Sequence, residues 1–415
     1  MDVIIGAGVT GLSYARFTSK TDFLILEKED RIGGYCKTTR RNGYTWDYSG
    51  HFFHFRNPEI KNFVFAHLDS SEIVEVVKRT KIFYKDQLID YPFQKNIHQL
   101  PKEELIDCLY DLFTIHEGTQ HTFLEMLYGK FGRAITEKFL RPYNEKLYAC
   151  DLNALDRTAM GRFFPYADRE EIIRNFKAHD TASYNESFVY PRRGASYYIE
   201  SISRPIPPDK IRLNVSVKEI RLDEHRVILD TGECIPYDRL VSTMPFVHLL
   251  NTTGVEYDES IYSWNQVLVF NLGFDSKGGD TQHHWLYFPE KTYCFYRVGF
   301  YDNILQQDRM SLYVELGFPK DCKVEPNEWL GLVLRDLEKA GIITNKQCLT
   351  DYESILMDPA YVHINAAAIR DVKEKKKWLE ARDVWSIGRY GSWTYCSIED
   401  NIIEARNLAS HHGKS

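Results

Sequence analysis

Three glycines directly after a short apolar run limit the fold of this chain more than any other feature. Residues 2–6 ("DVIIG") indicate a buried strand, and Gly6, Gly8 and Gly11 then form the motif G-x-G-x-x-G at the start of a segment with helical spacing. The first glycine of such a motif allows a tight turn, the second lets the backbone approach a pyrophosphate, and the third lets the helix pack on the strand. The helix N-terminus adds free N–H groups and a partial positive charge. The motif predicts a dinucleotide-binding sheet.

An acidic residue stands where a dinucleotide site needs one. The segment "DFLILEK" indicates a second apolar strand, and Glu27 near its end lies sixteen residues past Gly11, placed to accept bonds from ribose hydroxyls. Lys28 follows it, and a further pair, Gly33 and Gly34, comes next in "EKEDRIGGYCKT". This pair resembles the pattern of the glutathione-reductase-like flavoproteins, in which FAD lies extended. We therefore expect FAD rather than NAD, held in part by these four residues.

A second strand-to-helix turn is predicted near the C-terminus. The segment "GRYGSWTY" (388–395) lies between the apolar run "DVWSI" and the helix-like "EDNIIEARNLA". In flavoproteins of that superfamily such a turn contacts the pyrophosphate and the flavin, so we expect Gly388 and Arg389 at the cofactor. The aromatic residues would face the flavin ring or the substrate. A surface turn that binds nothing is the alternative for both glycine-rich segments.

The rest of the chain divides into helical and β-rich regions. Residues 101–164 carry apolar residues at helical intervals, whereas 211–245 and 265–318 alternate as strands do, and a hairpin is predicted about Lys85-Asp86. We expect an α/β fold (α+β overall): a Rossmann-like FAD-binding domain with an inserted helical lobe and an antiparallel β-sheet lobe. The expected boundaries are 1–80, 186–260 and 380–415 for the FAD-binding domain, 95–180 for the helical lobe, and 81–94 and 262–370 for the substrate-binding β-sheet lobe.

Charge and cysteine content exclude several classes of protein. The 415 residues carry a net charge of -7, so no basic field attracts nucleic acid or anionic membranes. The eight cysteines are scattered without a C-x-x-C pair, which argues against zinc and against a disulfide framework. No run approaches the ~18 apolar residues of a membrane span, and no signal-peptide pattern opens the chain. We expect a cytoplasmic protein without a metal site.

Eight segments together resemble the UDP-galactopyranose mutase family, and more closely its larger, eukaryotic-type form. They occur in the family's order through almost the whole chain: "SGHFFHF", "DYPFQKNIHQLPKEE", "FLRPYNEKLY", "AMGRFF", "LVSTM", "WLYFPE", "FYR" and "GRYGSWTY". Such a combination is much more specific than one glycine motif. The family fold combines an FAD-binding sheet, a helical lobe and a β-sheet lobe around a cleft, which matches the division expected above.

The resemblance implies an isomerase that interconverts UDP-galactopyranose and UDP-galactofuranose without net redox change. In that family the N5 atom of reduced FAD attacks the anomeric carbon, and NAD(P)H is a candidate reductant. The partner would be a UDP-sugar, while the oligomeric state stays open. A departing diphosphate needs cations aimed at it. Arg162 in "AMGRFF" and Arg297 in "FYR" match the family's diphosphate-binding arginines, and His51 in "SGHFF" matches a histidine beside the flavin.

Further substrate contacts are implied by the same resemblance. Aromatic side chains within strands are more often core than ligand, so each assignment depends on its motif. For the diphosphate the matching residues are Tyr287, Tyr361 and Tyr395. For the sugar, the uridine and the uracil pocket they are Asn144, Tyr148, Tyr91, Phe93, Gln94 and Trp285.

Two departures from the family pattern leave the sugar open. Tyr148 stands where eukaryotic-type mutases carry Trp, and Cys396–Asn401 ("CSIEDN") replaces the usual Gly-Asn-Gln or acidic segment. One alternative is therefore a mutase for a different nucleotide sugar. A second is an FAD-dependent amine oxidase or desaturase, which shares the FAD-binding half. A third is a non-catalytic, FAD-stabilised protein that binds UDP-sugars.

Overall fold

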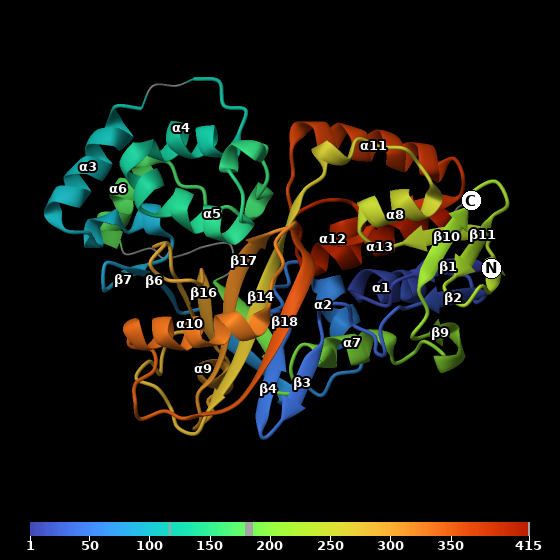
Figure 1. Ribbon diagram of the computed structural model, residues 1–415, viewed down its shortest axis with the longest axis horizontal. Helices are drawn as coiled ribbons and strands as arrows, with labels where there is room; N and C mark the ends of the chain where they lie inside the picture. Colours follow the sequence, from blue (N-terminus) through green and yellow to red (C-terminus); the bar gives the residue numbers. More distant parts are fainter. Residues whose placement is uncertain (116–117, 179–185, 414–415) are drawn as a thin grey trace.

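The computed structural model describes residues 1–115, 118–178 and 186–413. Figure 1 shows a helical group at one end, long strands in the middle, and a smaller sheet near both chain ends at the other. The fold is the mixed α/β arrangement that the glycine motif and the alternating segments predict. No helix within the described ranges is long and apolar enough to cross a membrane.

A parallel five-stranded sheet carries the glycine motif. Its order is β19-β13-β1-β2-β9, and every neighbouring pair is parallel. Strand β1 is buried in all four residues, as expected for a parallel sheet with helices on its faces. The five strands are β1 (Asp2–Ile5), β2 (Phe23–Leu26), β9 (Ile211–Arg212), β13 (Arg239–Ser242) and β19 (Val384–Ser386). The predicted Rossmann-like domain is confirmed.

Helices and small antiparallel elements surround this sheet. Helix α1 packs against α13 and α7, and α11 packs against β19. The helices are α1 (Val9–Phe17), α2 (Pro58–Phe65), α7 (Ser196–Ser203), α8 (Phe246–Thr253), α11 (Ala366–Glu380), α12 (Gly388–Gly391) and α13 (Ile398–His412). The small strands form the pairs β3 (Thr38–Arg41) with β4 (Tyr44–Asp47) and β5 (Ile73–Val77) with β8 (Ser187–Pro191), and the meander β10 (Val217–Arg221), β11 (Arg226–Leu229) and β12 (Cys234–Pro236).

A seven-stranded sheet forms the middle of the molecule. Its order is β18-β14-β17-β16-β15-β6-β7, antiparallel except between β15 and β6. The predicted hairpin is confirmed, because Lys85 and Asp86 join β6 to β7 with φ of 49° and 59°. The strands are β6 (Thr80–Tyr84), β7 (Gln87–Asp90), β14 (Trp264–Phe274), β15 (Trp285–Tyr287), β16 (Arg297–Phe300), β17 (Ser311–Pro319) and β18 (Leu349–Val362), accompanied by α9 (Tyr301–Leu305) and α10 (Pro326–Lys339).

The helical group is tied to this sheet by a buried lysine. Lys146 donates from its ammonium to the carbonyl oxygens of Phe288 (2.8 Å), Glu290 (3.0 Å) and Phe295, all between or beside β15 and β16. A capping box at Thr122 and Glu125 starts α4. The elements are α3 (Lys102–Phe113), α4 (Phe123–Ile135), a π-helical turn (Thr136–Leu140), α5 (Arg141–Tyr148), the 3₁₀ turn η6 (Gly161–Phe163) and α6 (Arg169–Ala178).

One buried carboxylate joins β3 and β4 to the other parts. Asp47 accepts bonds from the Thr38 hydroxyl (2.5 Å), the Tyr190 hydroxyl (2.8 Å) and the Ala195 N–H (3.0 Å). Its carbonyl oxygen accepts from Asn271 on β14 (2.9 Å). Burial raises the pKa of Asp47 to about 6. This residue fixes the start of the loop that leads to His51.

Replacement of Asp47 by Asn should change how stability depends on pH. In the unfolded chain the carboxyl ionises near its ordinary pKa of 3.8, whereas the folded protein holds the proton up to about pH 6. The unfolding free energy of the native protein should therefore fall by up to about 3 kcal/mol, relative to Asp47→Asn, as the pH rises from about 4 to about 6.5. Urea unfolding of both proteins at the two pH values measures the difference, and an unchanged difference would contradict the assignment.

Candidate active site

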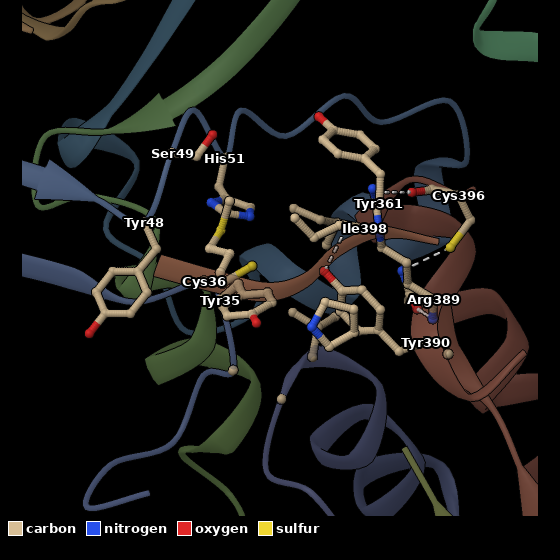
Figure 2. Close-up of a pocket in the computed structure, with 18 of the residues that line it drawn as sticks. Tyr35, Cys36, Tyr48, Ser49, His51, Tyr361, Arg389, Tyr390, Cys396 and Ile398 are labelled. Atoms are coloured by element: carbon tan, nitrogen blue, oxygen red, sulfur yellow. Dashed lines mark hydrogen bonds between the residues drawn. The ribbon is translucent and has the colours of Figure 1, made fainter. Parts of the chain in front are cut away.

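A cavity of about 1080 Å³ is lined by residues from all three parts of the molecule. Figure 2 shows Ser49 and His51 on one side of it, with Tyr361 and Arg389 on the other. The predicted site residues that line the cavity are Gly6, Gly8, Glu27, Lys28, Gly33, Gly34, His51, Tyr91, Asn144, Trp285, Tyr287, Arg297, Tyr361, Gly388, Arg389 and Tyr395. The structure therefore brings most of the predicted site together.

The two glycine turns press against each other at the edge of the parallel sheet. Gly8 forms a bridge with Gly33, whose φ is 120° and whose N–H donates to Ala7 (2.9 Å). A Cβ atom on Gly11 would lie 2.0 Å from the carbonyl oxygen of Gly6, so only glycine lets α1 start so close to β1. No side chain caps the N-terminus of α1. Bare backbone beside an uncapped helix start fits a pyrophosphate.

Glu27 is held in place at the end of β2. Its carboxylate accepts the N–H of Ala7 (2.7 Å) and the N–H of Glu29 (3.0 Å), one on each oxygen. Each carboxylate oxygen has a second lone pair, so the group can still accept bonds from a ribose. Lys28 points mostly into solvent, with its ammonium 3.7 Å from Glu29. Together with the glycine turns, Glu27 fits a dinucleotide.

The predicted C-terminal turn packs on the start of α1. Gly388 has φ of 88° and donates its N–H to Glu404 (2.8 Å). The Arg389 N–H donates to the side-chain oxygen of Asn401 (2.7 Å), which also accepts from Thr10 on α1 (3.1 Å). Residues of α13 therefore hold the turn against the dinucleotide end of the cavity.

Arg389 and His51 lie on opposite sides of the cavity. The Arg389 guanidinium lies over the rings of Tyr361 (5.0 Å) and Tyr395 (4.9 Å), which stack on each other. Burial, with a further contribution from Arg389, lowers the pKa of His51 to about 4. The buried Nδ1 atom of His51 has no partner among the described residues. His51 is therefore neutral near pH 7 and presents an unused ring nitrogen.

Arg297 is held by a carboxylate on the neighbouring strand. Arg297 lies opposite Glu315 in the β16–β17 register, and its guanidinium makes two bonds of 2.6 and 2.8 Å to that carboxylate. Ser49 donates its hydroxyl to the same carboxylate. Burial lowers the pKa of Arg297, but Glu315 and nearby tyrosines more than offset this and leave the pKa above its ordinary value. A charged guanidinium thus lines the cavity.

Arg162 lies beside the cavity and is not part of its lining. Its Nη2 atom donates to both carboxylate oxygens of Asp400 (2.6 and 2.7 Å). Asp400 and Ser397 form the capping box that starts α13. On the same turn as Arg162, Phe163 meets the ring of Tyr395 edge-on at 5.1 Å. The role of Arg162 at a diphosphate stays a prediction.

Tyrosine rings form another part of the wall. Trp285 donates from its indole nitrogen to the Tyr287 hydroxyl (2.8 Å), and the ring of Tyr91 lies 5.1 Å from that of Tyr287. Tyr143, which the sequence analysis missed, lies 5.2 Å from the Tyr287 ring and also lines the cavity. Its position next to Asn144 in the motif "RPYN" could have identified it as a site residue. The Asn144 side-chain oxygen is buried without a partner among the described residues.

Besides Arg162, four predicted site residues lie outside the lining: Gly11, Phe93, Gln94 and Tyr148. The three side chains support the wall from behind, each against a lining residue. Phe93 stacks on Phe139, Gln94 donates to the Pro165 carbonyl, and Tyr148 meets Tyr361 edge-on. Their predicted substrate contacts stay predictions. The described side chains also contain no group of three or more His, Cys, Asp or Glu residues that could hold a metal ion.

Comparison with known proteins gives one family model and several full-length relatives. The model for an NAD(P)-binding Rossmann-like domain matches residues 4–66. A crystal structure of reduced UDP-galactopyranose mutase superposes with a TM-score of 0.93 at 24% identity, covering 100% of this chain and 94% of that one. Coproporphyrinogen III oxidase of Staphylococcus aureus is 23% identical over 390 residues, 81% of this chain and 83% of that protein. Cyclohexylamine oxidase from Brevibacterium oxydans superposes with a TM-score of 0.71 at 14% identity, covering 100% and 98%.

These comparisons establish the fold. The chain has the fold of UDP-galactopyranose mutase over its whole length, which supports the resemblance drawn from the sequence motifs. Solved structures with this fold include a UDP-galactopyranose mutase and a cyclohexylamine oxidase. The Rossmann-like domain supports a dinucleotide cofactor.

The Arg297–Glu315 pair should be strongly coupled. Glu315→Gln removes the counter-ion of a buried guanidinium and should lower the unfolding free energy by about 3 kcal/mol. Arg297→Met combined with Glu315→Gln removes both charges and should recover most of that loss. Thermal unfolding of the native protein, both single variants and the double variant closes the cycle. If the effects of the two substitutions on the unfolding free energy are additive, the two side chains do not interact in solution.

Proposed function

We propose that this chain is an FAD-dependent isomerase of the UDP-galactopyranose mutase family that interconverts UDP-galactopyranose and UDP-galactofuranose. The observation that carries the proposal is Arg297, a charged guanidinium in the cavity wall of a chain with the mutase fold. Arg389 lines the same cavity. Two fixed cations favour an anionic substrate, because the low dielectric of a closed cavity strengthens their attraction for a diphosphate.

The side chains around the cavity suit departure and return of UDP. FAD, when bound in its reduced form, supplies the nucleophile for the anomeric carbon of the sugar. Arg297 stabilises the negative charge that develops on the leaving diphosphate, and Tyr361 and Tyr395 offer hydroxyl donors beside it. Neutral His51 has a ring nitrogen to bond to a polar edge of the flavin. Aromatic side chains from the helical group keep water from the reacting carbon.

An oxidase is the second candidate, and the relatives favour it in part. Both a coproporphyrinogen III oxidase and a cyclohexylamine oxidase are similar to this chain. Aromatic walls such as Tyr91 and Tyr143 also suit an apolar substrate. A protonated amine, however, would meet the positive charge of Arg389, which opposes its binding, whereas the charge of Arg297 is paired with Glu315. The mutase is therefore the better-supported proposal, with a mutase for another nucleotide sugar as its nearest variant.

The assay that tests the proposal uses purified, FAD-loaded protein and UDP-galactofuranose. We expect conversion to UDP-galactopyranose after reduction with dithionite and none without it, because the proposed chemistry needs the reduced cofactor. Chromatography of the nucleotide sugars follows the conversion. Hydrogen peroxide production from cyclohexylamine, without conversion of the sugar, would instead favour the oxidase. Binding of UDP-sugars without turnover in the reduced protein would favour a binding protein.

The charge-neutral double variant separates diphosphate binding from folding. Arg297→Met with Glu315→Gln should bind UDP about tenfold more weakly or worse, because one charge-assisted contact is lost. Its affinity for uridine, which lacks the diphosphate, should stay unchanged. Arg309→Met serves as the control, because Arg309 bonds Asn42 outside the cavity. Calorimetric titration measures both ligands, and an unchanged UDP affinity in the double variant would refute the role of Arg297.

A further inference from the structure

Lys37 is a buried lysine in the cavity wall that the reaction proposed above does not use. It lies three residues past the second glycine pair, and only 5% of its surface is exposed. It nevertheless lines the cavity. Lysine is almost never buried to this extent unless its charge is paired. The question is which group pairs with this ammonium.

The Lys37 side chain packs on the second glycine turn. A Cβ atom on Gly33 would lie 3.4 Å from the Cγ atom of Lys37, so the lysine stem packs on that glycine. Gly33 in turn forms the bridge with Gly8. The Lys37 carbonyl accepts the N–H of Tyr48, which fixes the backbone at the start of β3. The stem is therefore held where the backbone is bare.

No described residue forms a hydrogen bond or an ion pair with the Lys37 ammonium. Glu29, Glu27 and Asp30 are near enough to act on its pKa, but none of them bonds the ammonium. Glu27 accepts two backbone N–H groups, and Glu29 lies 3.7 Å from Lys28. Burial lowers the pKa of Lys37, opposed by Glu29, Glu27 and Asp30 and reinforced by Arg31. An ammonium in a cavity wall that has no direct hydrogen-bond or ion-pair partner can bind an anion.

The other basic residues near the second glycine turn differ from Lys37 in their bonds or their exposure. Arg31 donates to the Thr38 carbonyl (3.1 Å) and to the Tyr48 hydroxyl (3.1 Å), and it does not line the cavity. The Lys28 side chain is 73% exposed, so water screens its charge. Of these three basic residues, Lys37 is therefore the best placed to bind an anion together with the backbone N–H groups of the glycine turns.

We propose that the Lys37 ammonium binds the pyrophosphate of the dinucleotide cofactor where it crosses the Gly8 and Gly33 turns. This inference depends on the dinucleotide cofactor in the proposed function, but not on the sugar-nucleotide reaction. It assigns to the cofactor site a cation that lies three residues past the second glycine pair. It also predicts that Lys37 has opposite effects on the stability of the protein with and without cofactor. Its charge lowers stability in the empty protein, whereas the cofactor phosphates compensate it in the loaded protein.

The experiment compares Lys37→Met, which keeps the stem, with Lys37→Arg, which keeps the charge. Lys218→Met on β10 is the control, an exposed lysine whose loss changes the net charge equally. Apoprotein of each variant is titrated with FAD, followed by flavin fluorescence, and with ADP and adenosine by calorimetry. Thermal unfolding is recorded for each apoprotein and for each FAD-loaded protein.

We expect Lys37→Met to bind FAD and ADP about tenfold more weakly than the native protein, and adenosine equally well, because only the first two carry phosphates. Lys37→Arg should bind ADP within a few-fold of native. The Lys37→Met apoprotein should unfold at the native temperature or above it, whereas its stabilisation by FAD should shrink.

Two results would overturn the role of Lys37 alone. One is native ADP affinity in Lys37→Met. The other is a parallel loss of adenosine affinity and apoprotein stability, which would indicate a structural lysine. Failure of the native apoprotein to bind either FAD or ADP would instead refute the cofactor, and this inference with it.

Discussion

Buried positive charge around the cavity is the constraint on which the rest of the site depends. Arg297 is compensated by Glu315, which requires β16 and β17 to pair in one register. Arg389 lies over the faces of Tyr361 and Tyr395, whose π systems attract a cation. Lys37 has no protein partner among the described residues. The cavity wall combines basic residues with an equal number of acidic ones, namely Lys28, Lys37, Arg297 and Arg389 with Glu27, Glu29, Asp358 and Glu399. Its cations are therefore local points at which the diphosphates of the proposed cofactor and substrate can bind.

Local signals in the sequence were sufficient for much of the fold. The strand, the glycine turn and the helix at the N-terminus lie close together in the chain, and positive φ at Lys85 and Asp86 marks a hairpin that needs only its own residues. Strand β18 was not singled out, because its polarity is the reverse of the usual pattern. Tyr352 and Leu356 lie on its exposed face, whereas Asp351 and Glu353 lie on its half-buried face. Its backbone is held as a strand by antiparallel pairing with β14, which its amino-acid composition does not indicate.

The candidate site was predicted less completely, for physical reasons that differ from residue to residue. A motif match does not separate a lining side chain from one that supports the lining, so Phe93 and Tyr148 were expected at the substrate but lie behind Phe139 and Tyr361. The environment of Lys37 depends on Gly33 and on the engaged carboxylates of its neighbours. The burial of a side chain such as Lys37, and its lack of a bonding partner, arise only in the assembled cavity. The spacing of residues in the sequence does not indicate either property.

The segment that departs most from the family pattern has a structural reason for nearly every polar residue. Ser397 caps α13, Asn401 joins Thr10 to the Arg389 backbone, and Asp400 holds Arg162. If Arg162 serves a diphosphate, that ligand must share or replace the Asp400 carboxylate as its acceptor. The acidic residue in this segment thus sets how strongly Arg162 is drawn to a substrate, which a glycine or an amide at the same position would not do.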